Sequence, residues 1–125
     1  MIKGIGTDIV DITRIRGMIE KYGDLFLNRV YTKSEVAYCT QRADAAIPFA
    51  ARWAAKEAFY KALPSTCQCL GTWQSVEVVH TNQGVPSFRV ICQKLQEGLT
   101  SAGVTTIHLT LSHEKMCAVA FVIME

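Results

Sequence analysis

Two acidic residues stand in apolar surroundings, one near the start of the chain and one in its longest helical segment. In the stretch GIGTDIVDI, residues 4–12, strand alternation places Asp8 on the same face as Val10. At about 100° per residue, Glu57 falls within the apolar face predicted for a helix over 46–63. An unpaired buried carboxylate costs free energy or takes up a proton, so each of these side chains needs a partner.

Three arrangements would neutralise two such carboxylates. Each could pair with a neighbouring cation, and Lys61 is one helical turn from Glu57. The two could instead share a proton as an acid–base dyad. A hard divalent cation could also bridge them, with water and substrate oxygens completing its coordination, which is how Mg²⁺ is commonly held in phosphate chemistry. Two carboxylates without a third favour Mg²⁺ over a Ca²⁺ cage.

Basic residues surround the proposed metal position. Arg52 and Lys56 are one turn apart on the adjoining side of the same helix, and Lys61 lies beside Glu57. Arginine suits bidentate contact with phosphate and lysine acts as a mobile point charge, whereas solvated helix charges are the alternative interpretation. His113, at the end of an apolar strand register, is either a hydrogen-bonded structural residue or a further contact to phosphate or substrate.

The composition predicts one reduced domain over residues 1–125. Half of the chain is hydrophobic, which allows a single core of moderate size. A charged fraction of 19% and a net charge of +2 argue against a protein that coats nucleic acid. Five cysteines, an odd number, and no signal peptide indicate a cytoplasmic location. No apolar stretch reaches the ~18 residues of a membrane span, so no membrane partner is expected.

The elements that must position these residues follow from periodicity and turn signals. Helices are expected at 13–22, 32–42, 46–63 and 92–102, and strands at 4–12, 73–80, 85–91, 106–112 and 117–124. The strands and helices do not alternate as βαβ units. The sequence therefore predicts an α+β fold in which a mostly antiparallel sheet packs on a long central helix.

Four stretches of the sequence resemble the holo-[acyl-carrier-protein] synthases, the small bacterial 4′-phosphopantetheinyl transferases. They are GIGTDIVDI at 4–12, FAARWAAKEAFYKAL at 49–63, the Gly84-Val85-Pro86 turn and LTLSHE at 109–114. The first two, at this spacing, are the specific part. The resemblance implies a 4′-phosphopantetheinyl transferase-like fold, a homotrimer with active sites between subunits, and transfer of phosphopantetheine from coenzyme A to a serine of apo acyl carrier protein, with release of adenosine 3′,5′-bisphosphate.

The resemblance also implies roles for individual residues. Asp8 and Glu57 are implied as the ligands of a Mg²⁺ cofactor, with Lys61 beside them as a third catalytic residue. Contacts to coenzyme A are implied at Arg52, Lys56, Lys61, Gly84, Pro86 and His113. The docking element for the acidic carrier protein is implied at Arg14, Met18, Lys21, Phe26 and Arg29.

Some features stay open at this point. Ala51 stands where the family commonly has glycine, and residues 64–71 replace the family's glycine-rich loop, so the contacts of that loop are not carried over. The serine proton could pass to a water on the metal or to one of the two carboxylates. A non-enzymatic module that grips a carrier or a nucleotide, and a metal-dependent phosphate hydrolase, are the competing functions.

Overall fold

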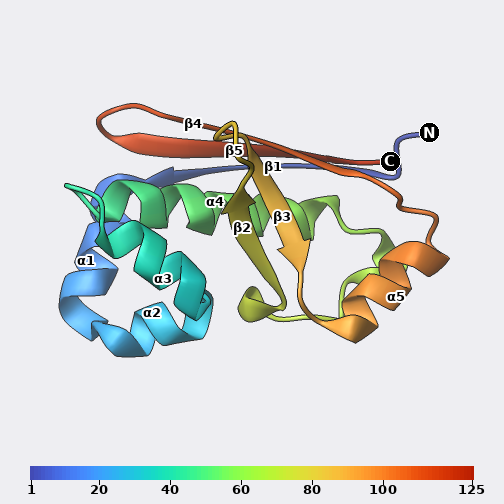
Figure 1. The fold of residues 1–125 in the computed structure, drawn as a ribbon, viewed down its shortest axis with the longest axis horizontal. Coiled ribbons are helices and arrows are strands. Elements are labelled where there is room, and N and C mark those ends of the chain that lie inside the picture. The colour runs from blue at the N-terminus through green and yellow to red at the C-terminus, as the bar shows by residue number, and fades with distance from the viewer.

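The computed structural model describes residues 1–125 and has its helices on one side of a three-stranded sheet (Figure 1). The strand order is β1-β5-β4, where β1 is Gly4–Asp11, β4 is Ile107–His113 and β5 is Cys117–Met124. Strands β2 (Val76–His80) and β3 (Pro86–Val90) form a separate hairpin. Every pairing is antiparallel, which confirms the predicted α+β fold class.

The long helix α4 (Ala46–Ala62) lies directly against the inner face of this sheet (Figure 1). Its buried residues are mostly alanine, and glycines in β1 remove the remaining bulk. A Cβ atom added at Gly6 would lie 1.9 Å from the carbonyl oxygen of Ala58, so only glycine permits this approach. The sequence prediction of a long central helix is confirmed, and its contact with β1 is unusually close.

The buried side of α4 differs from the sequence prediction. The arc that contains Trp53, Glu57 and Lys61 is the partly open side, while the rest of the helix is buried almost all round. The alanines make the tight contact with the sheet because they are small. Glu57 is therefore at the edge of the core rather than inside it.

The other helices gather at the two ends of α4 (Figure 1). Helices α1 (Ile12–Tyr22), α2 (Asp24–Val30) and α3 (Lys33–Thr40) lie together at one end, and α5 (Gln93–Ser101) lies at the other. Thr32 opens α3 with the predicted capping box, whereas α2 is an element that the sequence analysis did not identify. None of the helices has the length and the apolar character required to cross a membrane.

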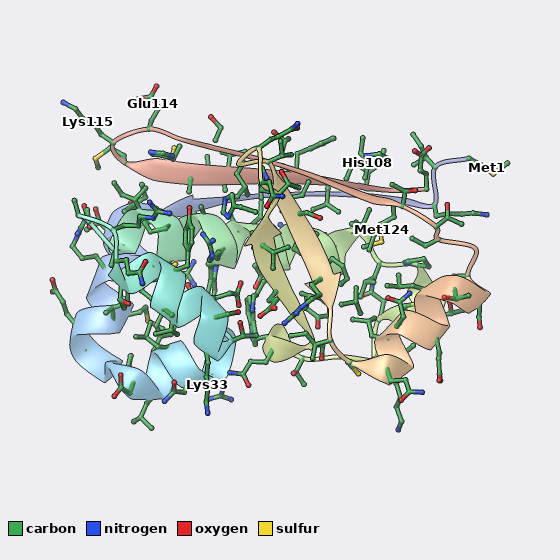
Figure 2. All side chains as sticks on the ribbon, in the orientation of Figure 1. Met1, Lys33, His108, Glu114, Lys115 and Met124 are labelled. Atoms are coloured by element: carbon green, nitrogen blue, oxygen red, sulfur yellow. The ribbon has the colours of Figure 1, made fainter.

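The outer face of the sheet carries no helix. Side chains on this face project away from the helical layer, and His108 is one of them (Figure 2). Apolar residues share the face: Ile5 and Ile9 of β1 are more than half exposed, and Phe121 of β5 lies beside them in the pairing register. An uncovered apolar sheet face of this kind is typical of a surface that contacts another protein.

Candidate functional site

The carboxylate of Asp8 lies between β1 and α4. The ammonium of Lys61 is 3.0 Å from Oδ1 of Asp8 and also donates to the carbonyl of Thr7 at 3.0 Å. The side chain of Asp8 is 16% exposed, whereas that of Lys61 is 53% exposed. The close approach at Gly6 brings the two elements together. Asp8 thus points toward the helix, as strand alternation predicts.

Glu57 lies near Asp8, but its carboxylate has no ion-pair partner. Its carboxylate takes part in none of the ion pairs of the structure. Burial raises the pKa of Glu57, and the charge of Asp8 raises it further, while Lys61 and Arg14 act in the opposite direction. The two carboxylates are therefore close enough to repel one another, and a single exposed lysine does not balance them.

We call Asp8, Glu57 and Lys61 the carboxylate site, and its donor set suits a hard divalent cation. Carboxylate oxygens are preferred ligands of Mg²⁺, which usually completes its coordination with water and phosphate oxygens. No group of three or more His, Cys, Asp or Glu side chains gathers in the structure, so this is a two-carboxylate site. A cation here would also relieve the repulsion that raises the pKa of Glu57.

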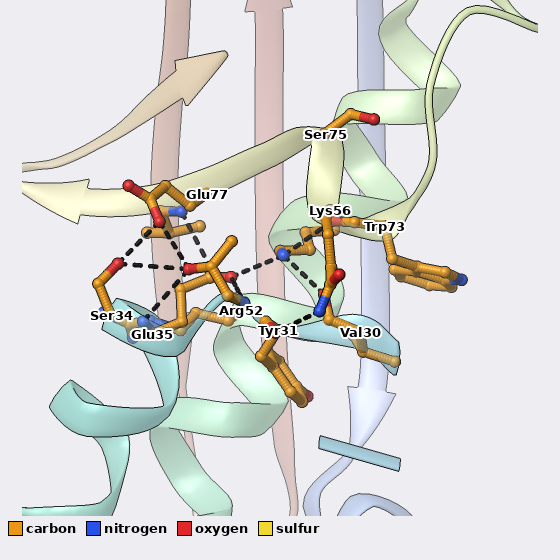
Figure 3. Close-up of polar contacts among 12 residues, drawn as sticks. Val30, Tyr31, Ser34, Glu35, Arg52, Lys56, Trp73, Ser75 and Glu77 are labelled. Carbon is orange, nitrogen blue, oxygen red and sulfur yellow. Dashed lines mark hydrogen bonds and ion pairs between the residues drawn. The ribbon is translucent and has the colours of Figure 1, made fainter. Parts of the chain in front are cut away.

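Lys56 does not reach the carboxylate site, although the sequence analysis predicts that it contacts phosphate. Its side chain is 0% exposed, and the ammonium lies 2.6 Å from Oε1 of Glu35. It also donates to the carbonyls of Val30 at 2.7 Å and Trp73 at 2.8 Å (Figure 3). All three ammonium donors are used inside the core. The prediction is wrong because Glu35, a residue of another helix, neutralises Lys56 inside the core.

A second cluster lies on the other flank of α4. A pocket of about 500 Å³ contains Arg52 and His113, two of the predicted contacts to coenzyme A, but none of the carboxylate site. The five-residue separation of Arg52 and Glu57 corresponds to about 140° around the helix. We call this the arginine pocket; its polar lining residues are Tyr38, Arg42, Asp44, Arg52, His80, Ser112 and His113.

Arg52 is almost fully enclosed and lacks an acidic partner. It is 3% exposed and takes part in no ion pair. Its Nη1 donates to the carbonyl of Pro48 and its Nη2 contacts Nδ1 of His80, each at 3.5 Å, while Nε is buried without a partner. A buried guanidinium without a carboxylate keeps its positive charge available to an anionic ligand.

The sequence analysis did not predict five of the polar residues that line the arginine pocket: Tyr38, Arg42, Asp44, His80 and Ser112. The four-residue spacing of Tyr38 and Arg42 is a signal that both share one side of α3, but it does not show what that side faces. His80 reads as an ordinary polar strand position, yet its ring stacks on Tyr38. His108, by contrast, lies at the surface, where its Nε2 is 2.8 Å from Oε1 of Glu125.

The predicted turn residues Gly84 and Pro86 lie on the side of the arginine pocket. Gly84 has a φ of +79° and its N–H donates to the carbonyl of Thr81 at 2.9 Å, as a tight hairpin turn requires. Pro86 pairs directly with His80, a lining residue of the pocket. Ala51, which replaces a glycine of the family pattern, lines the same pocket.

Three of the predicted docking residues meet in an apolar hollow between α1 and α2. This α1–α2 hollow has a volume of about 460 Å³ and is lined by Met18, Tyr22, Leu25, Phe26 and Arg29. The other two lie outside its lining: the guanidinium of Arg14 is 5.5 Å from the ring centre of Trp53, and the ammonium of Lys21 is 5.2 Å from that of Tyr22. The sequence analysis missed Tyr22 and Leu25.

The chain is similar over its whole length to known transferases. The sequence pattern of the 4′-phosphopantetheinyl transferase superfamily matches residues 4–119. A holo-[acyl-carrier-protein] synthase of Halothermothrix orenii is 41% identical over 126 residues, covering 100% of this chain and 98% of that protein.

Solved structures agree with this match. A holo-[acyl-carrier-protein] synthase of Neisseria meningitidis superposes with a TM-score of 0.86 at 32% identity, covering 100% of this chain and 99% of that one. One from Bacillus anthracis, solved in complex with CoA (3′,5′-ADP), superposes with a TM-score of 0.77 at 29% identity, covering 99% of this chain and 96% of that one.

Proposed function

This chain belongs to the holo-[acyl-carrier-protein] synthases of the 4′-phosphopantetheinyl transferase superfamily, and we propose that it transfers 4′-phosphopantetheine from coenzyme A to a serine of apo acyl carrier protein with Mg²⁺ as cofactor. The second product is adenosine 3′,5′-bisphosphate, and residues 1–125 act as one domain. One observation supports this proposal most strongly. Asp8 and Glu57 converge on one position, and Lys61 alone does not balance their two negative charges.

The diphosphate of coenzyme A binds at the carboxylate site. Asp8 and Glu57 would hold Mg²⁺, which supplies charge neutralisation and orientation for the diphosphate. Lys61 is half exposed, so its ammonium can turn from Asp8 toward a phosphate oxygen as a mobile point charge. The site thus replaces an unfavourable carboxylate repulsion with favourable contacts once the substrate is bound.

The reaction forms a bond between the serine oxygen and the β-phosphorus and breaks the bond from that phosphorus to the bridging oxygen. Adenosine 3′,5′-bisphosphate leaves with the bridging oxygen. The serine proton passes to a base, and Asp8 and Glu57 are the bases that the chain supplies at this site. Positioning and charge neutralisation provide most of the acceleration.

A homotrimer with active sites between subunits would unite the two clusters of predicted residues. The carboxylate site and the arginine pocket lie on opposite flanks of α4, so one subunit does not gather both around one ligand. The uncovered outer face of the sheet offers an apolar surface for association (Figure 1). Light scattering should give a mass of three chains; a fully active monomer would contradict this arrangement.

The acyl carrier protein docks at the α1–α2 hollow. The hollow is mostly apolar, Arg29 is one of its lining residues, and Arg14 and Lys21 lie on α1. Acidic partners are steered by basic residues of this kind, and an apolar centre supplies the affinity. Arg14 stands over Trp53, one turn before Glu57 on α4, which links the docking surface to the carboxylate site.

Mass spectrometry of the carrier protein tests the proposed function directly. Apo carrier incubated with the protein, coenzyme A and Mg²⁺ should gain the mass of one phosphopantetheine group. Asp8→Ala and Glu57→Ala should lose this activity by at least about 100-fold while remaining folded by circular dichroism. Glu97→Ala, which removes an exposed carboxylate of α5, is the matched control.

Two outcomes of that experiment would contradict the proposal. Full modification of the carrier by both Asp8→Ala and Glu57→Ala would show that the carboxylate site is not the catalytic centre. Release of free phosphopantetheine without a carrier would instead indicate hydrolysis, and an unmodified carrier with no consumption of coenzyme A would indicate a binding module.

A further inference from the structure

The arginine pocket has an excess of positive charge that no side chain compensates. Arg42 and Arg52 take part in no ion pair. Asp44 is the one acidic residue of the lining, and its two carboxylate oxygens accept from Arg16 at 2.7 and 3.0 Å. The pocket therefore presents two guanidinium groups whose counter-ion is missing from the chain itself.

The ring of Tyr38 contacts both guanidinium groups. The guanidinium carbons of Arg42 and Arg52 each lie 4.2 Å from the ring centre of Tyr38. The ring of His80 stacks on the same ring, with centres 5.0 Å apart and planes inclined by 14°. Contact with an aromatic face holds a guanidinium in orientation without cancelling its charge, unlike contact with a carboxylate.

His80 completes this arrangement as a neutral acceptor. Its Nδ1 is 3.5 Å from Nη2 of Arg52, and a guanidinium can only donate. Nδ1 must therefore accept, which places the imidazole proton on Nε2. Burial, with the charges of Arg52 and Arg42, lowers the pKa of His80, in agreement with a neutral ring. The chain thus positions Arg52 with an aromatic ring and an imidazole while its Nε is left unpartnered.

Chemistry identifies the anion that this pocket takes. The proposed function assigns the diphosphate of coenzyme A to the carboxylate site, and coenzyme A carries one further phosphate, a monoester on its ribose 3′-oxygen. Such a group has up to two negative charges and three acceptor oxygens, which suits two arginines. Dephospho-coenzyme A is identical except that it lacks this group.

We propose that Tyr38 and His80 are positioning residues: they hold the guanidinium of Arg52 in the way that a carboxylate partner commonly would, but without neutralising its charge. The arginine pocket thereby selects substrates with a 3′-phosphate, an inference that rests on the proposed function. Neither residue belongs to the sequence motifs of the chain described above. Their effect on catalysis passes through Arg52 and appears in substrate selection rather than in the chemical step.

Two pairs of substitutions test the proposal. Tyr38→Leu removes the aromatic face, whereas Tyr38→Phe keeps it. His80→Leu removes the acceptor, whereas His80→Asn keeps an acceptor at the position of Nδ1. We expect both leucine variants to lower kcat/KM for coenzyme A about tenfold, through KM. The kcat/KM for dephospho-coenzyme A should stay unchanged, so the preference for coenzyme A falls by the same factor.

The conservative variants distinguish positioning from a general loss of structure. Tyr38→Phe should match the parent protein, and His80→Asn should retain more of the preference than His80→Leu. Lys94→Ala, an exposed cation of α5, is the reference for an uninvolved substitution. An unchanged preference in both leucine variants would overturn the proposal, as would an equal loss for both substrates. If Tyr38→Leu does not fold, the comparison of His80→Leu with His80→Asn tests the proposal.

A binding measurement separates this proposal from the proposed function. Calorimetric titration with adenosine 3′,5′-bisphosphate needs neither a carrier protein nor turnover. About tenfold weaker binding by His80→Leu than by the parent protein is expected. If the parent protein fails to modify a carrier but this difference is found, the proposed function fails and the positioning role stands. Equal affinities would overturn the positioning role.

Discussion

Lys56 and Glu57 are consecutive residues of α4, yet the structure treats their charges in opposite ways. Lys56 is fully buried, with an acidic partner and two carbonyls around its ammonium. Glu57 is partly open, has no partner and is repelled by Asp8. The difference shows that the fold neutralises a charge where no ligand can enter and leaves a charge unbalanced where a ligand is proposed to bind.

The buried charge of Lys56 belongs to a network that joins three elements. Oε1 of Glu35 also accepts from the N–H of Thr32, and its Oε2 accepts from the N–H of Val78, each at 3.0 Å (Figure 3). Glu77 of β2 then accepts from the hydroxyl of Thr32 at 2.6 Å. The pair of Lys56 and Glu35 thereby fixes α3 and β2 on α4, and with them the Tyr38 side of the arginine pocket.

The largest expected effect comes from breaking the buried pair. Lys56→Met should lower the free energy of unfolding by about 3–5 kcal/mol, because Glu35 is left in the core without its cation. Burial lowers the pKa of Lys56 and the charge of Glu35 opposes this, so the lysine depends on its partner. Urea denaturation measures the loss, and the double variant Lys56→Met with Glu35→Gln should recover part of it. A loss under about 1 kcal/mol would mean that the pair is dispensable.

An intermediate effect is expected where β1 meets α4. Gly6→Ala places a Cβ atom 1.9 Å from the carbonyl oxygen of Ala58, so the strand must move. The variant should lose about 1–3 kcal/mol of stability and misplace Asp8. Gly17→Ala is the control, since a Cβ there meets nothing within 4 Å, and it should gain about 0.5–1 kcal/mol in helix α1. Equal stability of the two variants would contradict the close contact.

The smallest effect on stability is expected at Glu57, where removing the charge should stabilise the protein rather than destabilise it. Because the folded state raises the pKa of Glu57, protonated Glu57 costs no stability below the ordinary glutamate pKa of about 4.3, and stability is lost as the pH rises through the raised pKa and the side chain ionises. Without Mg²⁺, Glu57→Gln should therefore have a slightly higher Tm than the parent protein at pH 7. Thermal denaturation from pH 4 to 7 checks this, because the advantage should vanish at the acidic end. A lower Tm at pH 7 would contradict the unfavourable charge.

Much of the fold and part of the site follow from the sequence, for identifiable reasons. Strand alternation places Asp8 toward the helix, and the capping box at Thr32 marks the start of α3. Alternation and helical periodicity act within one element, so they specify which way a side chain points. Arg52 and His113, which their residue types and positions mark as candidate phosphate contacts, do share a pocket.

The remaining features depend on contacts between elements. The sequence does not show that Glu35, on another helix, neutralises Lys56, so Lys56 reads as a surface cation. His80 reads as an exposed strand residue because nothing local indicates that α3 packs beside it. The seven residues of α2 are too few to give a helical period, which is why the α1–α2 hollow could be predicted only in part.

Calorimetric titration of Mg²⁺ in the presence of coenzyme A tests the central claim most directly. The parent protein and the control Glu97→Gln should bind one Mg²⁺ per carboxylate site with equal affinity. Asp8→Asn and Glu57→Gln, which keep the shape of each side chain, should each bind at least about 10-fold more weakly. Equal Mg²⁺ affinity in all four proteins would contradict the claim that these two carboxylates hold the metal.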